Sequence, residues 1–274
     1  EDTVLDHCFE QVDFLSLHSY FQNPHDSTEE YFGNIELTDN FIKQTVAIAD
    51  AVAARKRSAK RIMLSFDEWN VWYKARSIED LRKPGWPVAP RLIEEIYNYE
   101  DALVVGGALI TLMNNCDRVK VACLAQLVNV IGPIMTEPGG PAWRQTIFYP
   151  FSQASRFGHG RVLRPVIDSP SYQAKTFDEI PYLCASVVDD EASGRTTIFA
   201  LNRHLEEDME LKIELRGLGA DRVVEEAIEL FNSNMKAINT KDTPNAVAPT
   251  YNADVRIEGE TLIAKLKPGS WNVL

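Results

Sequence analysis

A carboxylate among aromatic and amide side chains stands out in the segment Phe66–Tyr73, which reads FDEWNVWY. Glu68 could act as a nucleophile or as a proton donor in bond cleavage. Trp69 and Trp72 offer flat apolar faces with polar edges, and Asn70 offers both a hydrogen-bond donor and an acceptor. A sugar ring presents the matching mixture of C–H faces and hydroxyl groups. These residue types therefore indicate a carbohydrate-cleaving site.

The predicted position of Glu68 in the fold also favours a functional role. The preceding run Ile62–Phe66 is short and almost wholly apolar, as expected of a strand in a parallel sheet that is covered on both faces. Glu68 then lies at the C-terminal end of this strand, where binding and catalytic groups collect because variable loops leave a rigid sheet there. The structural alternative is a carboxylate that caps a helix or pairs with Lys74 or Arg76.

The first part of the chain, up to about Gly158, alternates between strand and helix patterns. A loop over residues 73–88 contains Pro84-Gly85-Trp86-Pro87, which no regular element tolerates, and long loops at a catalytic rim often act as lids. Only three strand-helix units fit into this part, whereas a closed (β/α)8 barrel needs eight. Strands are expected at residues 12–17, 61–66 and 119–127. Helices are expected to end near Phe9, to run from Thr38 or Asp39 to Arg57, from Pro90 to about Met113, and from Ala142 to Phe157.

After Gly158 the pattern changes to short β-rich runs separated by turns. Eight such runs without intervening helices indicate an antiparallel β-sandwich. The polar stretch from Asn232 to Asn252 is expected to be a long surface loop. We therefore divide the chain into a strand-helix part, residues 1–158, and a β-sandwich part, residues 159–274. The predicted strands are 162–166, 182–188, 196–201, 210–215, 222–230, 254–257, 262–267 and 271–274.

Composition and charge exclude several classes of function. The net charge of −12, from 28 basic and 40 acidic residues, argues against a nucleic-acid partner, because such binding needs clustered basic side chains. No apolar run reaches the roughly 18 residues of a membrane span, and the N-terminus lacks the basic and apolar parts of a secretion signal. The four cysteines show no Cys-x-x-Cys spacing, so we expect buried thiols in a reducing, cytoplasmic setting.

Four stretches of the sequence resemble one known family. Asp67–Tyr73 resembles the nucleophile segment of the family 51 glycoside hydrolases, the α-L-arabinofuranosidases, and the resemblance extends through nearly all 274 residues. It implies the C-terminal part of a catalytic (β/α)8 TIM barrel, followed by an antiparallel, jelly-roll-like β-sandwich domain. The other three stretches are Leu15–Tyr20 (LSLHSY), Ala125–Ile131 (AQLVNVI) and Gly269–Val273 (GSWNV), which resemble the sixth strand end, the eighth strand end and the closing strand of the family.

The resemblance implies roles for individual residues. Glu68 would be the nucleophile of a retaining mechanism, and Tyr20 would donate a hydrogen bond to it, although Tyr20 could also be a core aromatic. His18 is two residues before Tyr20 and points to the same face of its strand, so we assign it to orienting the site rather than to a purely structural hydrogen bond. Gln126 would contact the sugar, and Trp72 would form a wall of the pocket.

Expectations for the neighbouring residues are less specific. Trp69 either contacts the sugar or fills the core, and Asn70 is expected to brace the loop backbone. No metal site is expected, because His18 and Asp67 alone do not make one, and no cofactor is expected either.

The acid/base glutamate of the family stands in an Asn-Glu pair, and this chain contains no such dipeptide. The nearest sequence, Asn34-Ile35-Glu36, is expected to lie in a loop after the first strand. The chain therefore carries half of the catalytic pair, and we expect it to be inactive by itself.

These observations lead to one preferred hypothesis and two alternatives. The preferred hypothesis is a retaining α-L-arabinofuranosidase of arabinan degradation that acts on arabinose-containing oligosaccharides or polysaccharides. Its partners would be the missing N-terminal barrel half and further copies in a homo-oligomer, with no nucleic acid and no membrane. The alternatives are a non-catalytic carbohydrate-binding or assembly protein, and a β-glucan-cleaving enzyme of the same fold.

Overall fold

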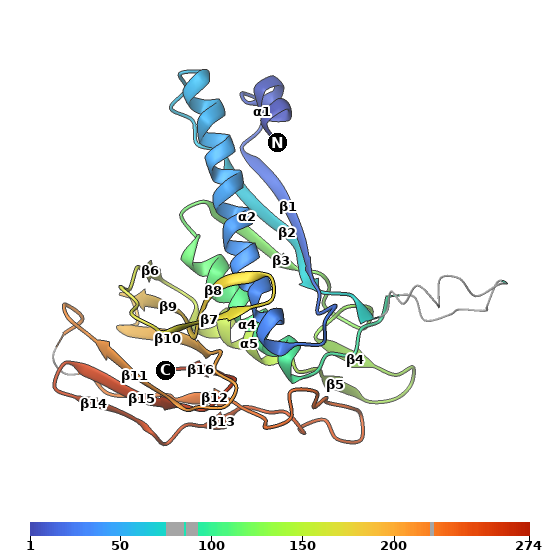
Figure 1. Cartoon of the computed structure of the whole chain (residues 1–274), viewed down its shortest axis with the longest axis vertical. Helices are drawn as coiled ribbons and strands as arrows, with labels where there is room; N and C mark the ends of the chain where they lie inside the picture. The colour runs from blue at the N-terminus through green and yellow to red at the C-terminus, as the bar shows by residue number, and fades with distance from the viewer. Residues whose placement is uncertain (75–84, 86–92, 220–221) are drawn as a thin grey trace.

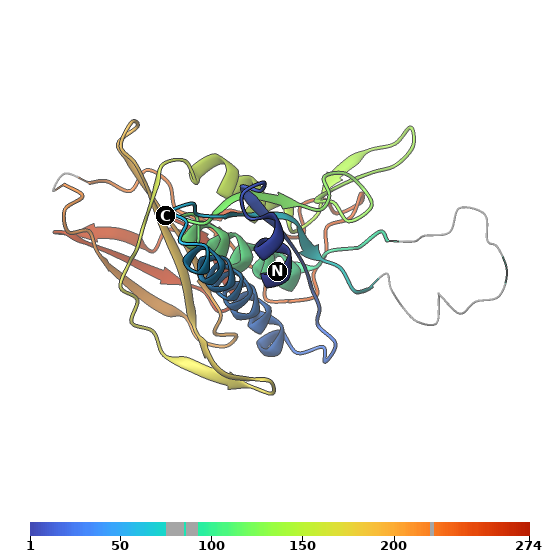
Figure 2. The ribbon, with the colours of Figure 1, turned by 90° about the horizontal axis from the view of Figure 1, so that it is seen from above.

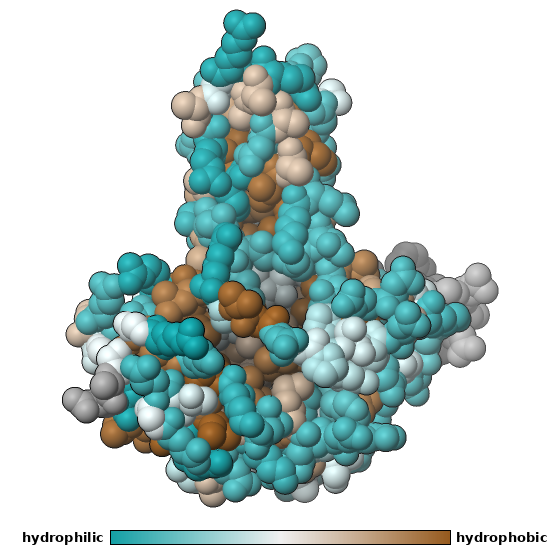
Figure 3. Space-filling view, turned by 60° about the vertical axis from the view of Figure 1, so that its left-hand side comes forward, coloured by the Kyte–Doolittle hydropathy of each residue, from teal (hydrophilic) through white to brown (hydrophobic). Residues whose placement is uncertain are grey.

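The computed structural model describes residues 1–74, 85, 93–219 and 222–274 (Figure 1). Most of the predicted loop 73–88, the predicted helix start at Pro90 and the pairing partner Arg76 lie outside these residues. A narrow part that carries α1 (Asp2–Cys8), α2 (Thr28–Arg55) and three parallel strands rises from a broader part that contains the antiparallel sheets. On one face of the narrow part, apolar residues are visible among hydrophilic ones (Figure 3).

The three strands of the first part form a parallel sheet in the order β1 (Phe14–Phe21), β2 (Met63–Val71), β3 (Val119–Leu124). All three strand predictions are confirmed, although β3 ends three residues early. The strand predicted at 61–66 extends to Val71, so Glu68 lies within β2 and not behind its end. In the β1–β2 register, His18 is opposite Glu68 and Tyr20 is opposite Asn70.

Helix α2 begins ten residues before the predicted cap at Thr38 or Asp39. Ser27 is the N-cap, and its Oγ accepts a hydrogen bond from the Glu30 N–H at 3.2 Å. Thr38 is instead buried within the helix and donates to the Asn34 carbonyl at 2.8 Å. The stretch Asn34-Ile35-Glu36 consequently lies in a helix, and its prediction as a loop is wrong.

Helix α4 (Tyr99–Asn114) is buried between the parallel sheet and the larger of the two antiparallel sheets of the second part. It starts at a capping box, in which the Asn98 side chain accepts from the Asp101 N–H at 3.0 Å and Asp101 accepts from the Asn98 N–H at 2.8 Å. The helix predicted from Pro90 is therefore wrong over residues 93–98, which form no helix. Gly106 allows close packing, because a Cβ there would be 2.5 Å from the buried Trp271 ring.

The segment predicted as one helix from Ala142 to Phe157 contains a strand and a shorter helix. A hairpin of β4 (Ile134–Thr136) and β5 (Ala142–Arg144) precedes α5 (Phe148–Phe157), so the helix prediction is wrong before Phe148. This hairpin lies on the side of the molecule away from the antiparallel sheets (Figure 2).

The second part contains a six-stranded antiparallel sheet and a three-stranded one, with an apolar cluster of leucine, valine, isoleucine and alanine side chains between them. Each of the eight predicted runs contains a strand, whereas β13 and the hairpin β7–β8 were not predicted. The larger sheet has the order β13 (Thr250–Tyr251), β12 (Ile228–Leu230), β16 (Ser270–Val273), β10 (Arg195–Asn202), β9 (Leu183–Asp190), β6 (Arg161–Leu163); the smaller has β11 (Met209–Glu214), β15 (Thr261–Leu266), β14 (Val255–Glu258); the hairpin is β7 (Ser171–Ala174) and β8 (Phe177–Pro181).

Two predictions from composition can be compared with the described residues. In the part of the chain that the structure describes, no helix combines the length and the apolar character of a membrane span. The prediction of buried thiols is wrong for Cys123, which is exposed, and the other three cysteines are only partly buried. Cys123 is exposed because it lies on β3, an edge strand of the described parallel sheet.

Candidate active site

The pairing of β1 with β2 brings the carboxylate of Glu68 between two side chains of the neighbouring strand. The Tyr20 hydroxyl donates a hydrogen bond to Glu68 Oε1. The Nδ1 atom of His18 lies 3.2 Å from Glu68 Oε2. Each carboxylate oxygen thus has its own partner, so the orientation of the carboxylate is fixed. The Glu68 and His18 side chains remain 41% and 53% exposed, which leaves the group accessible to a substrate.

A second set of contacts holds His18 from its other ring nitrogen. Nε2 lies 3.3 Å from Ser16 Oγ and 3.5 Å from Asp67 Oδ1, and the Ser16 hydroxyl donates to Asp67 Oδ1 at 2.7 Å. Ser16 was not identified from the sequence, although its two-residue spacing from His18 places both on one face of the strand. Among the described residues, no cluster of histidine, cysteine or acidic side chains could hold a metal ion.

The two tryptophans near Glu68 differ in their surroundings. The Trp72 ring lies edge-on against Tyr20, with centroids 5.1 Å apart and an interplanar angle of 70°, and is partly exposed. Trp69 is 1% exposed and belongs to the hydrophobic core. Of the two expectations for Trp69, core packing is therefore confirmed.

Asn70 braces the backbone that follows β3, as predicted. It is fully buried, and its Nδ2 donates to the carbonyls of Ala125 at 2.6 Å and Ile131 at 2.7 Å. Its Oδ1 accepts from the Val71 N–H at 2.7 Å. Gln126 follows Ala125 directly and is exposed. The structure thus brings His18, Tyr20 and Trp72 together around Glu68, and it holds the backbone beside Gln126 without showing a contact from the Gln126 side chain.

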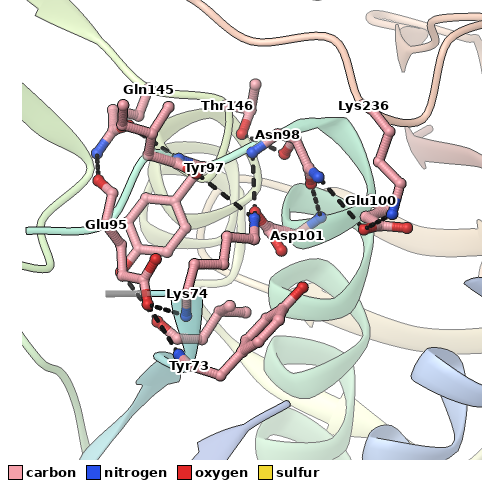
Figure 4. Close-up of polar contacts among 12 residues, drawn as sticks. Tyr73, Lys74, Glu95, Tyr97, Asn98, Glu100, Asp101, Gln145, Thr146 and Lys236 are labelled. Atoms are coloured by element: carbon pink, nitrogen blue, oxygen red, sulfur yellow. Dashed lines mark hydrogen bonds and ion pairs between the residues drawn. The ribbon is translucent and has the colours of Figure 1, made fainter. Parts of the chain in front are cut away.

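Behind the strand ends lies a buried polar network at the start of α4 (Figure 4). Glu100 and Asp101 are both fully buried. Asp101 Oδ2 lies 2.5 Å from Lys74 Nζ, and Glu100 Oε1 lies 2.6 Å from Lys236 Nζ. Burial raises the pKa of Asp101, and Lys74 opposes this rise. Sequence reasoning missed this network, although the spacing of Asn98 and Asp101 in front of an apolar run is a capping signal.

The carboxylate of Glu36, in the nearest sequence to an Asn-Glu pair, is engaged elsewhere. Its Oε1 accepts a hydrogen bond at 2.7 Å from Nη1 of Arg203, which is buried at the end of β10. Glu36 therefore forms a contact between α2 and the antiparallel part.

The sequence and the structure are both similar to known arabinofuranosidases. The family model described as "Alpha-L-arabinofuranosidase C-terminal domain" matches residues 67–270. An intracellular exo-alpha-(1->5)-L-arabinofuranosidase from Halalkalibacterium halodurans is 49% identical over all of this chain and 54% of its own length. An enzyme of the same description from Bacillus subtilis is 45% identical, also over all of this chain and 54% of its own length.

Solved structures agree with these relatives. A family 51 alpha-L-arabinofuranosidase from Bifidobacterium longum superimposes with a TM-score of 0.90 and 36% identity, over 99% of this chain and 54% of that chain. An alpha-L-arabinofuranosidase from Thermotoga maritima in complex with arabinose gives a TM-score of 0.81 and 25% identity, over the same shares of the two chains. The chain spans about half the length of the curated relatives it matches.

Proposed function

Because the chain belongs to the family 51 alpha-L-arabinofuranosidases, we propose that it is the C-terminal part of a retaining glycoside hydrolase that releases α-L-arabinofuranosyl residues. The proposed substrates are arabinose-containing oligosaccharides and polysaccharides, since the relatives are named for arabinofuranosyl release. Several of these relatives are named intracellular, which supports a cytoplasmic location. A homo-oligomeric state remains a prediction.

The observation that carries this proposal is the arrangement of Glu68 between Tyr20 and His18. In a retaining mechanism one carboxylate attacks the anomeric carbon, and a second, about 5 to 5.5 Å away, protonates the leaving oxygen and then activates water. We assign the attack to Glu68. The Tyr20 hydrogen bond on Oε1 and the His18 contact on Oε2 restrict rotation of the carboxylate, so that attack needs little reorientation. Trp72 would form a wall beside the sugar, and Gln126 would bind a hydroxyl group.

The acid/base glutamate is proposed to lie outside this chain, in the first half of a TIM barrel. β1, β2 and β3 would be the last three strands of a (β/α)8 barrel over residues 1–158, and residues 159–274 would form a jelly-roll-like β-sandwich domain. β1 and β3 are the edges of the described parallel sheet. Phe14 on β1 is 47% exposed and Val121 on β3 is 39% exposed, as expected of strands that another barrel half would cover.

The aromatic residues of the antiparallel part support the enzymatic proposal over a carbohydrate-binding module. Sugar binding on a sheet needs ring faces that are open to solvent. Tyr182 is stacked on Tyr172 at 4.9 Å and packs against His204 on its other side at 4.5 Å, while Trp271 is fully buried. These rings pack within the protein, whereas Tyr251 on β13 is 69% exposed. One open ring among the described residues of this part does not make the row of ring faces that a glycan platform needs.

The proposal is tested with the protein completed by its upstream barrel half. Glu68→Gln, which keeps the shape of the side chain but removes the nucleophile, should lower turnover of an aryl arabinofuranoside by several orders of magnitude. The matched control is Glu260→Gln in the exposed β14–β15 turn, which should leave turnover unchanged. Azide should restore turnover of Glu68→Ala, because it can take the place of the missing nucleophile. An unchanged rate in Glu68→Gln would remove Glu68 from the mechanism.

The need for the upstream half is tested separately. The 274-residue chain alone should show no turnover, because it lacks the proposed acid/base residue. Turnover by the chain alone would show that the missing-half proposal is wrong.

A further inference from the structure

Two adjacent buried carboxylates at the start of α4 each bind a lysine that comes from a different part of the chain (Figure 4). Glu100 and Asp101 lie in the first helical turn, where the helix dipole and free N–H groups favour negative charge. A buried carboxylate without a counter-charge is costly, so each lysine is held firmly. Lys74 and Lys236 therefore connect the segments that carry them to the buried helix α4.

The first lysine fixes the segment behind the candidate nucleophile. Lys74 binds Asp101, and its backbone N–H and that of Tyr73 both donate to Glu95 Oε1 at 2.8 Å. Glu95 is only 1% exposed. Trp72 directly precedes this fixed pair of residues. The segment that follows β2 is thus held through the backbone N–H groups of Tyr73 and Lys74 and through the Lys74 side chain.

The second lysine comes from the antiparallel part. Lys236 Nζ binds Glu100 and also donates to Asp26, and the Glu100 N–H donates to the Met235 carbonyl at 3.0 Å. Asp26 lies in the turn of residues 22–27, which joins the end of β1 to α2. The hydrogen bond from Lys236 is the main reason that the pKa of Asp26 is lowered. Thr28, the first residue of α2, donates to Glu100 Oε2 at 2.7 Å.

Residues 22–27 and 72–74 will be called the rim segments. One follows the strand of His18 and Tyr20, and the other follows the strand of Glu68. The rim segment at residues 22–27 is bound by a side chain from the antiparallel part, Lys236. This part is therefore connected to the site through an ion pair as well as through apolar packing.

We propose that Lys236 is a positioning residue for the candidate active site, through which the antiparallel part fixes the rim segment at residues 22–27. The inference rests on the proposed function. Lys236 does not contact the reacting groups. It acts by holding Asp26 in place against Glu100, beside the strand that orients Glu68. Its loss should weaken substrate binding more than it slows bond cleavage, because the Tyr20 and His18 contacts to Glu68 remain.

A matched control exists within the antiparallel part. Lys267 is 49% exposed and lies 2.6 Å from Glu229, which is buried, whereas Lys236 is 46% exposed and lies 2.6 Å from buried Glu100. In the protein completed by its upstream half, Lys236→Met should raise KM for an aryl arabinofuranoside about tenfold with kcat changed less than about twofold. Lys267→Met should change neither, and Lys236→Arg should restore most of the loss. Equal kinetics in Lys236→Met and Lys267→Met would overturn the proposal.

A second measurement does not depend on activity. The amides of Asp26, Ser27, Glu30 and Tyr31 are hydrogen-bonded within or just after the rim segment, so their hydrogen exchange reports on its order. Exchange in residues 22–31 should become faster in Lys236→Met and unchanged in Lys267→Met. Asp26→Asn, which removes the negative charge of the exposed partner and leaves the buried pair intact, should have the same effect without a risk to folding.

The two measurements distinguish the failure of this inference from that of the proposed function. Unchanged exchange in both Lys236→Met and Asp26→Asn would overturn the positioning role, whatever the activity. A completed wild-type protein without arabinofuranosidase turnover would overturn the proposed function, and faster exchange in these variants would still support the role of Lys236 in ordering the rim segment.

Discussion

Replacement of Asn70 by alanine should destabilise the protein by about 2–4 kcal/mol, a large effect for the removal of three heavy atoms. Asn70 is fully buried between β2 and the segment that follows β3. Alanine would leave the Ala125 carbonyl and the Val71 N–H without the bonds that Asn70 now makes. The Ile131 carbonyl would lose less, because it also accepts from the Tyr97 hydroxyl at 3.1 Å.

The magnitude follows from counting these two groups. A buried polar group that loses its partner costs about 1–3 kcal/mol, and two of them in a site that can relax slightly give about 2–4 kcal/mol. With an m-value of about 2 kcal/mol/M, the urea midpoint should fall by about 1–2 M. Circular dichroism during urea unfolding measures this shift.

Asn34 provides a matched control for this prediction. Its Nδ2 also donates to two carbonyls, those of Tyr31 at 2.8 Å and Gln22 at 3.1 Å, but at a solvent-accessible position on α2. Asn34→Ala should cost less than about 1 kcal/mol, because water can replace the bonds and alanine favours the helix. Asn70→Ala should therefore lower the free energy of unfolding more than Asn34→Ala does. An equal or smaller loss would show that the unpaired backbone groups are not costly, and the reasoning would be wrong.

Three further predictions concern the site, the packing and a thiol. Tyr20→Phe should lower kcat of the completed enzyme about 10- to 100-fold, the equivalent of one lost hydrogen bond to a charged group, and an unchanged kcat would contradict the proposed role of this bond. Gly106→Ala should be destabilising in urea unfolding, because a methyl group 2.5 Å from the Trp271 ring costs about 1–3 kcal/mol and outweighs a gain in helix propensity of at most about 1 kcal/mol. Part of the Cys184 residue reaches solvent, but its thiol is surrounded by protein atoms, and this burial raises the pKa of the thiol to about 11. Its thiolate fraction at pH 8 is thus about 0.1%, and alkylation of this thiol by iodoacetamide should rise about tenfold per pH unit between pH 8 and pH 10, whereas a rate that levels off near pH 9, as for an ordinary thiol, would contradict the raised value.

The strands were predicted more accurately than the helix starts. Largely apolar short runs such as Ile62–Phe66 indicate a buried strand from local sequence alone. Helix starts depend on which of several polar residues becomes the cap. Ser27 competes with Thr38 and Asp39 for α2, and only the packing of residues 28–38 against other elements decides between them. Helix α4 shows the same competition between caps. The sequence suggested a start at Pro90, but α4 begins after Asn98, whose side chain accepts a hydrogen bond from the Asp101 N–H.

The candidate site could be predicted in part because the residues that matter lie at the ends of predicted strands. Glu68, Tyr20 and Trp72 all follow from that rule together with the family resemblance. The contacts of Lys236 could not be predicted, since it is separated from Asp26 by 210 positions and from Glu100 by 136. The local sequence around a lysine in a polar loop does not indicate which residue the lysine pairs with. Such contacts depend on how the antiparallel part packs against α4, which only the structure shows.

The proposed division of the catalytic pair between two halves of a barrel would explain why this chain can contain an ordered nucleophile site without the proposed acid. The groups that orient Glu68 are on β1, the neighbouring strand. The segment that follows β2 is held by Glu95, which binds the backbone of Tyr73, and by Asp101 of α4, which binds the Lys74 side chain. All of these contacts form within the chain, so the upstream half is not needed to orient the carboxylate. Its proposed contribution is the proton donor and the remaining sugar contacts. Orientation of the nucleophile and supply of the proton should therefore be separable, and Tyr20→Phe should weaken catalysis without weakening the association of the two halves.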